Sequence, residues 1–425
     1  MTNSVPRVAT LAAPAQRDII MSMAQERLAL YVHIPFCQAK CPYCDFNSYA
    51  GLESLMAPYA DALIAEMALW REATRDARVT SVFFGGGTPS FLPPAETERI
   101  FTALRCSFRL APDAEITAEA NPGSTDSARL DGLRRLGFNR LSLGVQSFQD
   151  DDLRLLGRVH SAAEAREAYR AARRAGFENV NLDLIYGLPG QPLAAWQRTL
   201  AEAIDLRPEH LSLYALTLEE GAPLAADVAR GRLPAPDADL AADMYLWAGE
   251  ALAAAGYQQY EISNWALPGY RCRHNLVYWH NEPYLGLGAG AHSCLGGFRF
   301  AAVRDPRAYI RDVMASGAEP RADGLAVFLA GLRHLEIVEE TTPARAIAET
   351  VILGLRLVEG VSVAAFRRRF GASLLSVYAP AVAELTALGL LERANGRIRL
   401  TPKGRLLGNE AFERFLPDEA GSVTT

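Results

Sequence analysis

The chain has 425 residues, of which 50% are hydrophobic and 9% aromatic, so it can bury a large core and form more than one domain. Its formal net charge of −6 is mild for this length and argues against broad, non-specific binding of nucleic acid or anionic lipid. Because no apolar run approaches the roughly 18 to 20 residues of a membrane span, we expect a cytoplasmic protein with at most peripheral membrane association.

The predicted elements begin after residues 1–24, which we expect to be a flexible extension with Met21 or Met23 as alternative starts. Apolar, β-branched runs then alternate with segments of helical period. The six predicted strands lie at 28–36, 79–85, 115–120, 139–146, 179–186 and 210–217. Such an alternation predicts an α/β fold with a parallel sheet, here a partial (β/α)6 TIM-like barrel over residues 25–265. In these barrels functional side chains lie at the carboxyl ends of the strands.

Three cysteines follow the first predicted strand. Cys37, Cys41 and Cys44 have the spacing Cys-x3-Cys-x2-Cys, which can hold three irons of a [4Fe–4S] cluster and leave the fourth iron open for a ligand. Zinc is the alternative, with His33 as the fourth ligand of a closed site. The position after a barrel strand favours the cluster. The other cysteines, Cys106, Cys272 and Cys294, are scattered, as is typical of reduced thiols.

Unusual residues also mark the ends of the later strands. They are GGGTP at 85–89 after the second strand, Glu119 and Asn121 after the third, Gln146 at the end of the fourth and Asp183 late in the fifth. Consecutive glycines let backbone groups approach a small ligand without a Cβ in the way. A carboxylate such as Asp183 is costly to bury, so it either faces a ligand or pairs structurally with a backbone amide or an arginine.

A second candidate site is the stretch HNLVYW at 274–279. An imidazole such as that of His274 can be an axial ligand of haem iron, and Tyr278 and Trp279 offer flat apolar faces to a porphyrin. The alternative is a packed, hydrogen-bonded histidine of purely structural role. Three neighbours compete as iron ligands: Cys272, His280 and His292.

Beyond about residue 340 the pattern changes to helices followed by a hairpin, whose turn is Asn395-Gly396. We therefore expect a C-terminal α+β winged-helix-like domain over 341–418, joined to the barrel by a linker at 266–340 that carries HNLVYW. Such domains often bind DNA, and Arg367, Arg368 and Arg369 could face phosphate. Solvated helix arginines are the simpler interpretation, so we expect no nucleic-acid partner.

The motifs together resemble a known family. The cysteine spacing, with Tyr43 before the last cysteine, and GGGTP after the second strand resemble radical S-adenosylmethionine (radical SAM) proteins. YVHIPFC, GGGTPS, EANP, NRLSLGVQSF, NLDLIYGLPGQ and GRLLGNE resemble the branch with oxygen-independent coproporphyrinogen III oxidase and the HemW-type haem chaperones. The resemblance implies a cluster whose open iron binds SAM. The residues that it implies for SAM are Tyr31, Gly86, Gly87, Thr88, Glu119, Gln146, Arg158 and Asp183, and those for haem are His274, Asn275, Tyr278 and Trp279.

Phe46 separates the two activities of this branch. The oxidase subgroup has a further cysteine two residues after the third cluster ligand, where this chain has Phe46. The resemblance therefore favours a haem chaperone that transfers haem to recipient proteins such as respiratory enzymes, with an electron donor for the cluster. The alternatives are an oxygen-independent coproporphyrinogen III oxidase and, with least support, a metal-bearing DNA regulator.

Overall fold

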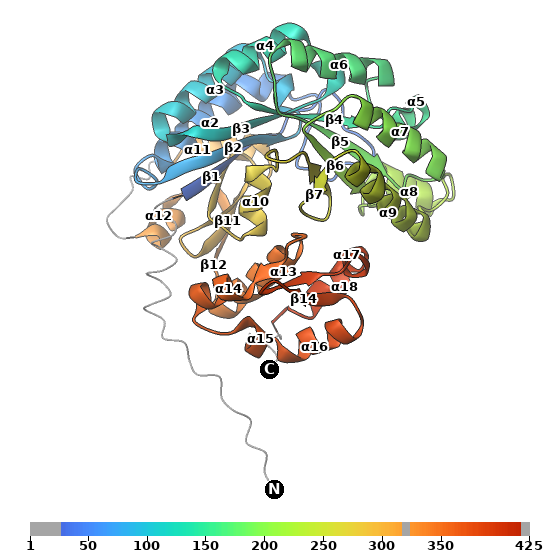
Figure 1. Cartoon of the computed structure of the whole chain (residues 1–425). Helices are drawn as coiled ribbons and strands as arrows, with labels where there is room; N and C mark the ends of the chain where they lie inside the picture. The colour runs from blue at the N-terminus through green and yellow to red at the C-terminus, as the bar shows by residue number, and fades with distance from the viewer. Residues whose placement is uncertain (1–26, 317–323, 418–425) are drawn as a thin grey trace.

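The computed structural model describes residues 27–316 and 324–417, so the expected extension at 1–24 lies outside the described residues. Six parallel strands form the centre of a twelve-stranded sheet with the order β12-β11-β10-β9-β1-β2-β3-β4-β5-β6-β8-β7 (Figure 1). They are β1 Arg27–Ile34, β2 Arg78–Gly86, β3 Arg109–Ala120, β4 Arg140–Gln146, β5 Val180–Tyr186 and β6 His210–Ala215. The predicted partial barrel is confirmed.

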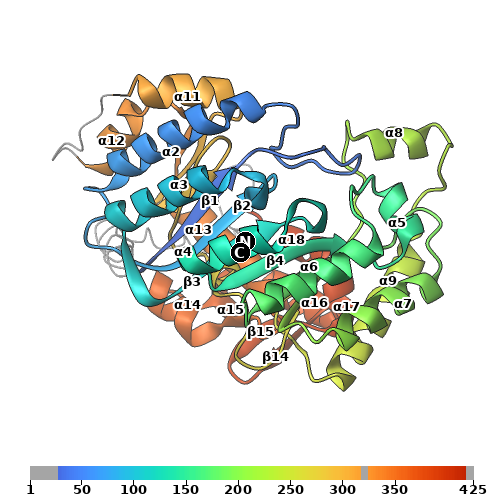
Figure 2. The same ribbon diagram turned by 90° about the horizontal axis from the view of Figure 1, so that it is seen from above.

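Helices cover the convex face of the arched sheet, as Figures 1 and 2 show. The long ones are α2 Met56–Trp70, α3 Pro94–Ser107, α4 Ser127–Leu136, α6 Ala162–Arg174, α7 Leu193–Asp205 and α9 Ala238–Ala254, and the short ones are α5 Asp150–Leu155 and α8 Pro223–Ala229. The main core lies between this layer and the sheet, where Phe138 and Trp196 are fully buried. Within the described ranges, no helix is long and apolar enough to cross a membrane.

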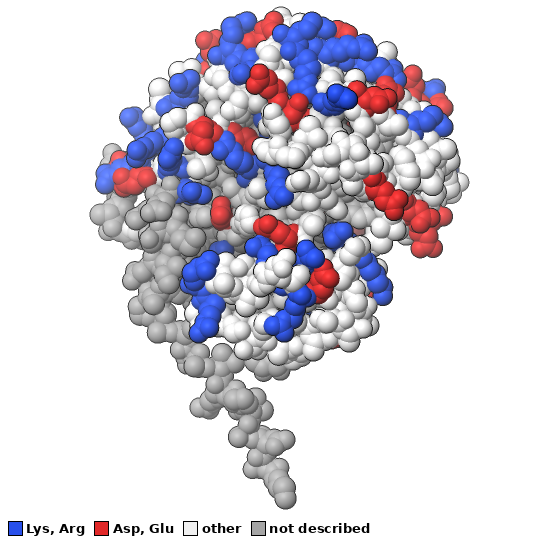
Figure 3. Space-filling model, viewed as in Figure 1, with Lys and Arg blue, Asp and Glu red and all other residues white. Residues whose placement is uncertain are grey.

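Basic side chains gather over these outer helices (Figure 3). Several are paired with carboxylates: Arg173 lies 2.8 Å from Glu209, and Arg174 lies 2.5 Å from Glu167. Such pairs neutralise part of the positive charge of this patch.

Residues 266–340, expected to be a linker, instead extend the sheet. β9 Tyr284–Leu287 pairs in parallel with β1, and the antiparallel strands β10 His292–Leu295, β11 Phe298–Ala302 and β12 Leu335–Glu340 follow. β7 Gln258–Gln259 and β8 Asn264–Ala266 extend the other edge, and α10 Arg273–Trp279, α11 Pro306–Met314 and α12 Leu325–Gly331 complete the segment. These strands are short and lack a long apolar run, so each depends on a neighbouring edge: β9 pairs with β1, and β10, β11 and β12 each pair with the strand before them.

One buried carboxylate fastens this added segment to the barrel. Glu66, on α2, accepts hydrogen bonds from the Gly288 amide at 2.8 Å and the Tyr309 hydroxyl at 2.6 Å. The Nε2 atom of His334 lies 3.0 Å from its other oxygen. Glu66 is 1% exposed, so none of these groups has water as a substitute partner.

The C-terminal domain packs against the concave side of the sheet (Figure 1). Its helices are α13 Pro343–Leu355, α14 Val363–Phe370, α15 Leu374–Val377, α16 Ala379–Ala387, α17 Pro402–Leu406 and α18 Gly408–Glu413, and its three-stranded sheet contains β13 Val361–Ser362, β14 Leu391–Ala394 and β15 Arg397–Leu400. Asn395 and Gly396 both have positive φ, as the predicted hairpin turn requires. The domain boundaries themselves stay a prediction.

Two arginines of this domain contact the end of α10. The Arg356 guanidinium lies 4.9 Å from the centre of the Trp279 ring, and Arg369 donates to the Asn281 carbonyl at 2.9 Å. Arg369 therefore faces the barrel, whereas Arg367 and Arg368 are exposed to solvent. The arrangement leaves no row of three arginines for DNA phosphates.

We expect Glu66→Ala to lower the free energy of unfolding by about 3 kcal/mol, because it leaves buried donors without an acceptor. Urea unfolding followed by tryptophan fluorescence measures the change. Glu72→Ala is the matched control, since Glu72 forms an exposed pair with Arg75 just beyond α2. Equal midpoints for the two variants would show that the carboxylate does not fasten the segment.

Candidate functional site

A pocket of about 380 Å³ opens at the carboxyl ends of the parallel strands. It collects most of the side chains that the sequence singles out at strand ends. The strand-end residues that line it are Cys37, Cys41, Cys44, Gly86, Gly87, Thr88, Glu119, Asn121, Gln146 and Asp183, and Arg158, which the resemblance implies for SAM, lines it too. The barrel rule for strand ends therefore locates the candidate site.

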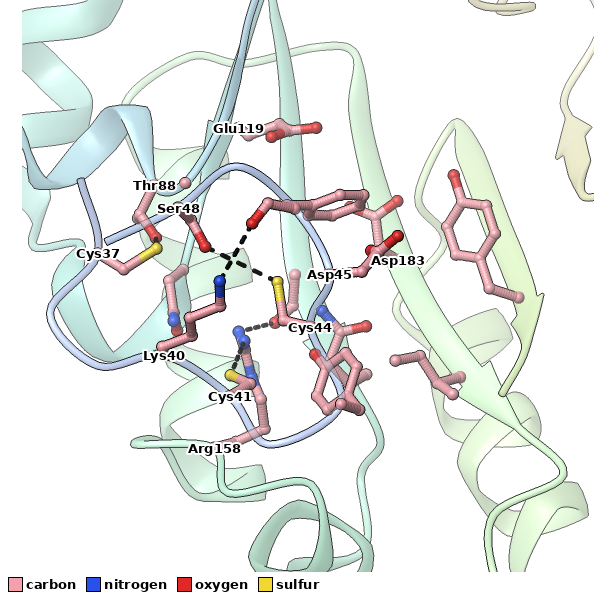
Figure 4. A pocket seen from close by; sticks show the side chains of 18 of the residues that line it. Cys37, Lys40, Cys41, Cys44, Asp45, Ser48, Thr88, Glu119, Arg158 and Asp183 are labelled. Carbon is pink, nitrogen blue, oxygen red and sulfur yellow. Dashed lines mark hydrogen bonds between the residues drawn. The ribbon is translucent and has the colours of Figure 1, made fainter. Parts of the chain in front are cut away.

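The three cysteine thiols stand on different parts of one loop and border the same space (Figure 4). The Cys37 sulfur accepts a hydrogen bond from Thr88 Oγ1 at 3.6 Å, and the Cys41 sulfur accepts one from Arg158 Nη1 at 3.3 Å. Burial raises the pKa of the Cys37 and Cys44 thiols, which favours the protonated form until a metal displaces the proton.

The donor set fits a cluster better than a single ion. Among the described residues, no three ligand side chains converge closely enough to hold one metal ion. Three separated sulfurs around a shared space are what a multi-iron cluster needs, because each thiolate binds a different iron. His33 does not complete a zinc site, since its Nε2 contacts the Asn47 carbonyl at 2.8 Å and its Nδ1 contacts the Tyr31 hydroxyl at 3.0 Å.

Glu119 occupies the end of β3 beside the glycine run. Its carboxylate accepts a hydrogen bond from the Gly86 amide at 3.2 Å. Burial, and then the nearby Asp183 carboxylate, raise its pKa to about 8. Without a cationic partner Glu119 is therefore largely protonated at neutral pH.

The glycines at 85–87 were expected to let the backbone approach a small ligand, but the structure gives a different reason for them. Gly86 has φ +112°, and a Cβ there would lie 2.4 Å from the His33 ring. A Cβ on Gly87 would lie 2.7 Å from the Phe36 carbonyl oxygen. The close approach is thus between the end of β2 and the end of β1 with the residues that lead into the cysteine loop, so these glycines serve this packing before they serve any ligand.

Asp183 is paired and also faces the pocket. It accepts hydrogen bonds from Ser142 at 2.9 Å and Asn181 at 2.8 Å. Its partners are neutral side chains, unlike the backbone amide or arginine considered from the sequence, and burial raises its pKa. Gln146 at the pocket wall has φ 66°, an uncommon value for a residue other than glycine.

HNLVYW lies away from the pocket lining, on α10. His274 is 1% exposed, and its two ring nitrogens contact Ser81 Oγ at 3.0 Å and the Tyr278 hydroxyl at 2.9 Å. Burial, reinforced by the charge of Arg140, lowers its pKa to about 3, so the ring is neutral. Asn275 and Trp279 are partly buried, Cys272 is buried, and His280 and His292 are exposed.

Tyr31 lies beside the pocket without lining it. Its ring stacks on Phe83 at 6.3 Å between ring centres, and Phe83 stacks on His274 at 5.2 Å. An aromatic column therefore connects the region of Glu119 with α10.

Several residues that line the pocket were not predicted from the sequence. They include Ser142, Ile185, Tyr214 and Leu216. Strand alternation could have predicted Ser142 and Tyr214 as lining residues. Side chains two positions apart on a strand face the same side of a sheet. Ser142 precedes Gly144 and Gln146 on β4 in this register, and Tyr214 follows Ser212 on β6.

Comparisons with known proteins agree with this geometry. Residues 31–203 match the radical SAM superfamily, and residues 341–407 match the HemN C-terminal domain. The heme chaperone HemW of Bacillus subtilis (strain 168) is 37% identical over 387 residues, which are 91% of this chain and 98% of that protein. The heme chaperone HemW of Escherichia coli (strain K12) is 37% identical over 393 residues, which are 92% and 98% of the two chains.

A solved structure shows the same architecture. Coproporphyrinogen III oxidase (HemN) from Escherichia coli, described as a radical SAM enzyme, aligns with a TM-score of 0.78 at 27% identity, covering 95% of this chain and 93% of that one. With such identity to the HemW proteins over nearly their whole length, the chain belongs to the HemW family of radical SAM proteins.

Proposed function

We propose that this protein is a haem chaperone that binds haem and transfers it to recipient haem proteins in the cytoplasm. The observation that carries the proposal is the identity to heme chaperones named HemW across almost the full length of both chains. Phe46 supports it, because the resembling oxidase subgroup has a cysteine at that position. Respiratory enzymes are the recipients, and an electron donor serves the cluster.

Membership of the radical SAM family implies a [4Fe–4S] cluster and SAM. We assign Cys37, Cys41 and Cys44 as the cluster ligands, which the separated sulfurs around one pocket support. When bound, the cluster supplies the electron with which this family cleaves SAM. The chain itself provides a carboxylate at Glu119 that can ionise on meeting the SAM amino group and hold it.

The remaining SAM contacts follow from the position of the residues around the pocket. Gly86, Gly87 and Thr88 offer backbone and hydroxyl groups beside the cysteine loop. Gln146, Arg158 and Asp183 line the same pocket, where Arg158 also contacts the Cys41 sulfur, and Tyr31 is close enough to Glu119 to feel its charge. We propose all of them as SAM contacts or supports.

The sequence proposes His274, Asn275, Tyr278 and Trp279 as haem contacts. In the present arrangement, ligation of iron by His274 requires the loss of its hydrogen bonds to Ser81 and Tyr278 and the opening of α10. His280 and His292 need no such opening, because both are exposed.

A coproporphyrinogen III oxidase is the second candidate, which the structural likeness to HemN favours. Fold alone does not decide between a carrier and an enzyme, because the same barrel supports both.

An anaerobic haem titration of the cluster-reconstituted protein, followed at the Soret band, tests the main proposal. We expect saturation at about one haem per chain, and transfer to an added apo-haem protein. If the protein bound no haem but converted coproporphyrinogen III in the presence of SAM and a reductant, the oxidase proposal would stand in place of the chaperone proposal.

We expect Cys41→Ala to abolish cluster assembly, because two thiolates cannot hold a three-ligand cluster. Iron and acid-labile sulfide should fall from about four each per chain to near zero. Cys106→Ala, on the outer helix α3, is the matched control and should keep both. Normal iron in the first variant would exclude Cys41 as a ligand.

Binding of SAM should depend on the ionisation of Glu119. Since its pKa is about 8 in the free protein, the carboxylate must lose a proton to pair with the cationic amino group. Affinity for SAM should therefore rise by up to about tenfold per pH unit between pH 6.5 and 8, and fall at higher pH because the SAM amino group then loses its own proton.

Isothermal titration across this pH range checks that expectation. Glu119→Gln should bind SAM more weakly and without the pH dependence, whereas Glu98→Gln, at an exposed position on α3, should behave as wild type. A flat wild-type profile would contradict the assigned role of Glu119.

A further inference from the structure

We propose that Arg356 of the C-terminal domain is the cationic anchor for a propionate of haem bound along α10. This inference rests on the proposed haem-chaperone function, with HNLVYW as the haem contact, and it adds a residue from outside that motif. It assigns a purpose to an arginine that stacks on Trp279 and has no carboxylate partner of its own.

The end of α10 is more open than its start. The helix lies between the sheet and the C-terminal domain (Figure 1), and the barrel closes its first turn, where His274 is 1% exposed. Tyr278 and Trp279 are partly exposed, and His280, directly after the helix, is exposed. Haem that contacts HNLVYW therefore has the C-terminal domain as its neighbour.

Arg356 holds its guanidinium over this end of the helix. The residue directly follows α13, and its guanidinium carbon lies 4.9 Å from the centre of the Trp279 ring and 5.6 Å from that of the Phe412 ring. Its backbone is also fixed, because the Arg356 carbonyl accepts a hydrogen bond from the Ile262 amide at 3.1 Å. Two aromatic rings and a hydrogen-bonded backbone thus orient the side chain before any ligand arrives.

The charge of Arg356 is not paired. In the part of the chain that the structure describes, it forms no ion pair, and its Nε atom has no hydrogen-bond partner. Burial lowers the pKa of the guanidinium, and the neighbouring Glu261 carboxylate offsets this only in part. Glu261 already accepts hydrogen bonds from the Ser263 amide at 3.0 Å and from the Asn264 side chain. A partly buried cation without an anion is costly, so the position favours a carboxylate supplied by a ligand.

A second donor without a partner belongs to the same cluster. The indole N–H of Trp279 is buried and has no acceptor among the described residues. A carboxylate has two oxygens, so a single group can accept from both the guanidinium and the indole. Trp279 lies five residues beyond His274, about 7.5 Å along the helix axis. The propionates of haem extend from its iron by a similar length, so haem centred on this helix brings a carboxylate to Arg356.

Two other arginines near this end of α10 are already used. Arg369 donates to the Asn281 carbonyl at 2.9 Å, just beyond the end of the helix. Arg299 forms an ion pair with Glu349 at 2.5 Å. Of these three arginines, Arg356 is the one whose charge is left for a ligand.

The test compares haem with haem dimethyl ester, in which both propionates are uncharged, by anaerobic Soret titration of the cluster-reconstituted protein. Wild type should bind haem about tenfold more tightly than the ester. Arg356→Gln should bind the two ligands within about twofold of each other, because its amide carries no charge. Arg356→Lys keeps the charge and should retain a preference for haem. Arg367→Gln, at an exposed position of the same domain, is the matched control and should keep the wild-type preference.

The outcomes distinguish this anchor from the proposed function. A wild type that binds neither ligand would overturn the haem-chaperone function itself. A wild type that binds haem and the ester equally, or an Arg356→Gln variant that keeps the wild-type preference, would overturn the anchor and leave the function standing. Loss of both ligands to the same extent in Arg356→Gln would show a structural role and would also overturn the anchor. Because the preference is a ratio measured within one variant, general damage to the fold cancels from it.

Discussion

The polar inner face of the barrel is the constraint on which the rest of the structure depends. Groups there are shielded from water, so each must find a partner inside the protein. Asp183 at the pocket is held by Asn181, whose oxygen contacts His210 Nδ1 at 2.7 Å, and His210 Nε2 contacts the Tyr260 hydroxyl at 2.8 Å. The Tyr260 carbonyl accepts from Val358 of the C-terminal domain at 3.0 Å. One hydrogen-bonded chain therefore runs from the pocket to the domain joint, and it fixes the position of the site.

The same constraint explains what the sequence could and could not reveal. The six parallel strands could be predicted because each is a buried apolar run followed by a helix. The rule for strand ends then predicts that Glu119, Gln146 and Asp183 meet in one pocket. The strands β9 to β12 could not be predicted from the sequence, because each has only four to six residues and gains its pairing from a neighbouring edge. The environment of His274 is equally hidden, since Ser81 lies 193 positions away along the chain. The need for Gly86 is visible in the sequence, but its cause, the His33 ring, is not.

A shared fold with coproporphyrinogen III oxidase leaves the difference in function to a few side chains. Both proteins would present a cluster and SAM at the same end of the barrel, so the distinction rests on what stands next to them. A cysteine at position 46 adds a reactive thiol beside the cluster, whereas phenylalanine adds an inert ring. At that single position a thiol beside the cluster loop is replaced by an exposed ring.

The helix α10 contacts both domains and so couples the barrel to the C-terminal domain. Its first turn contacts the barrel through His274, and the C-terminal domain contacts its last residue, Trp279, and Asn281 just beyond it. In a rigid helix of seven residues, neither set of contacts can shift without moving the other. Docking of the C-terminal domain and the state of the barrel interior are thus linked with equal strength in both directions.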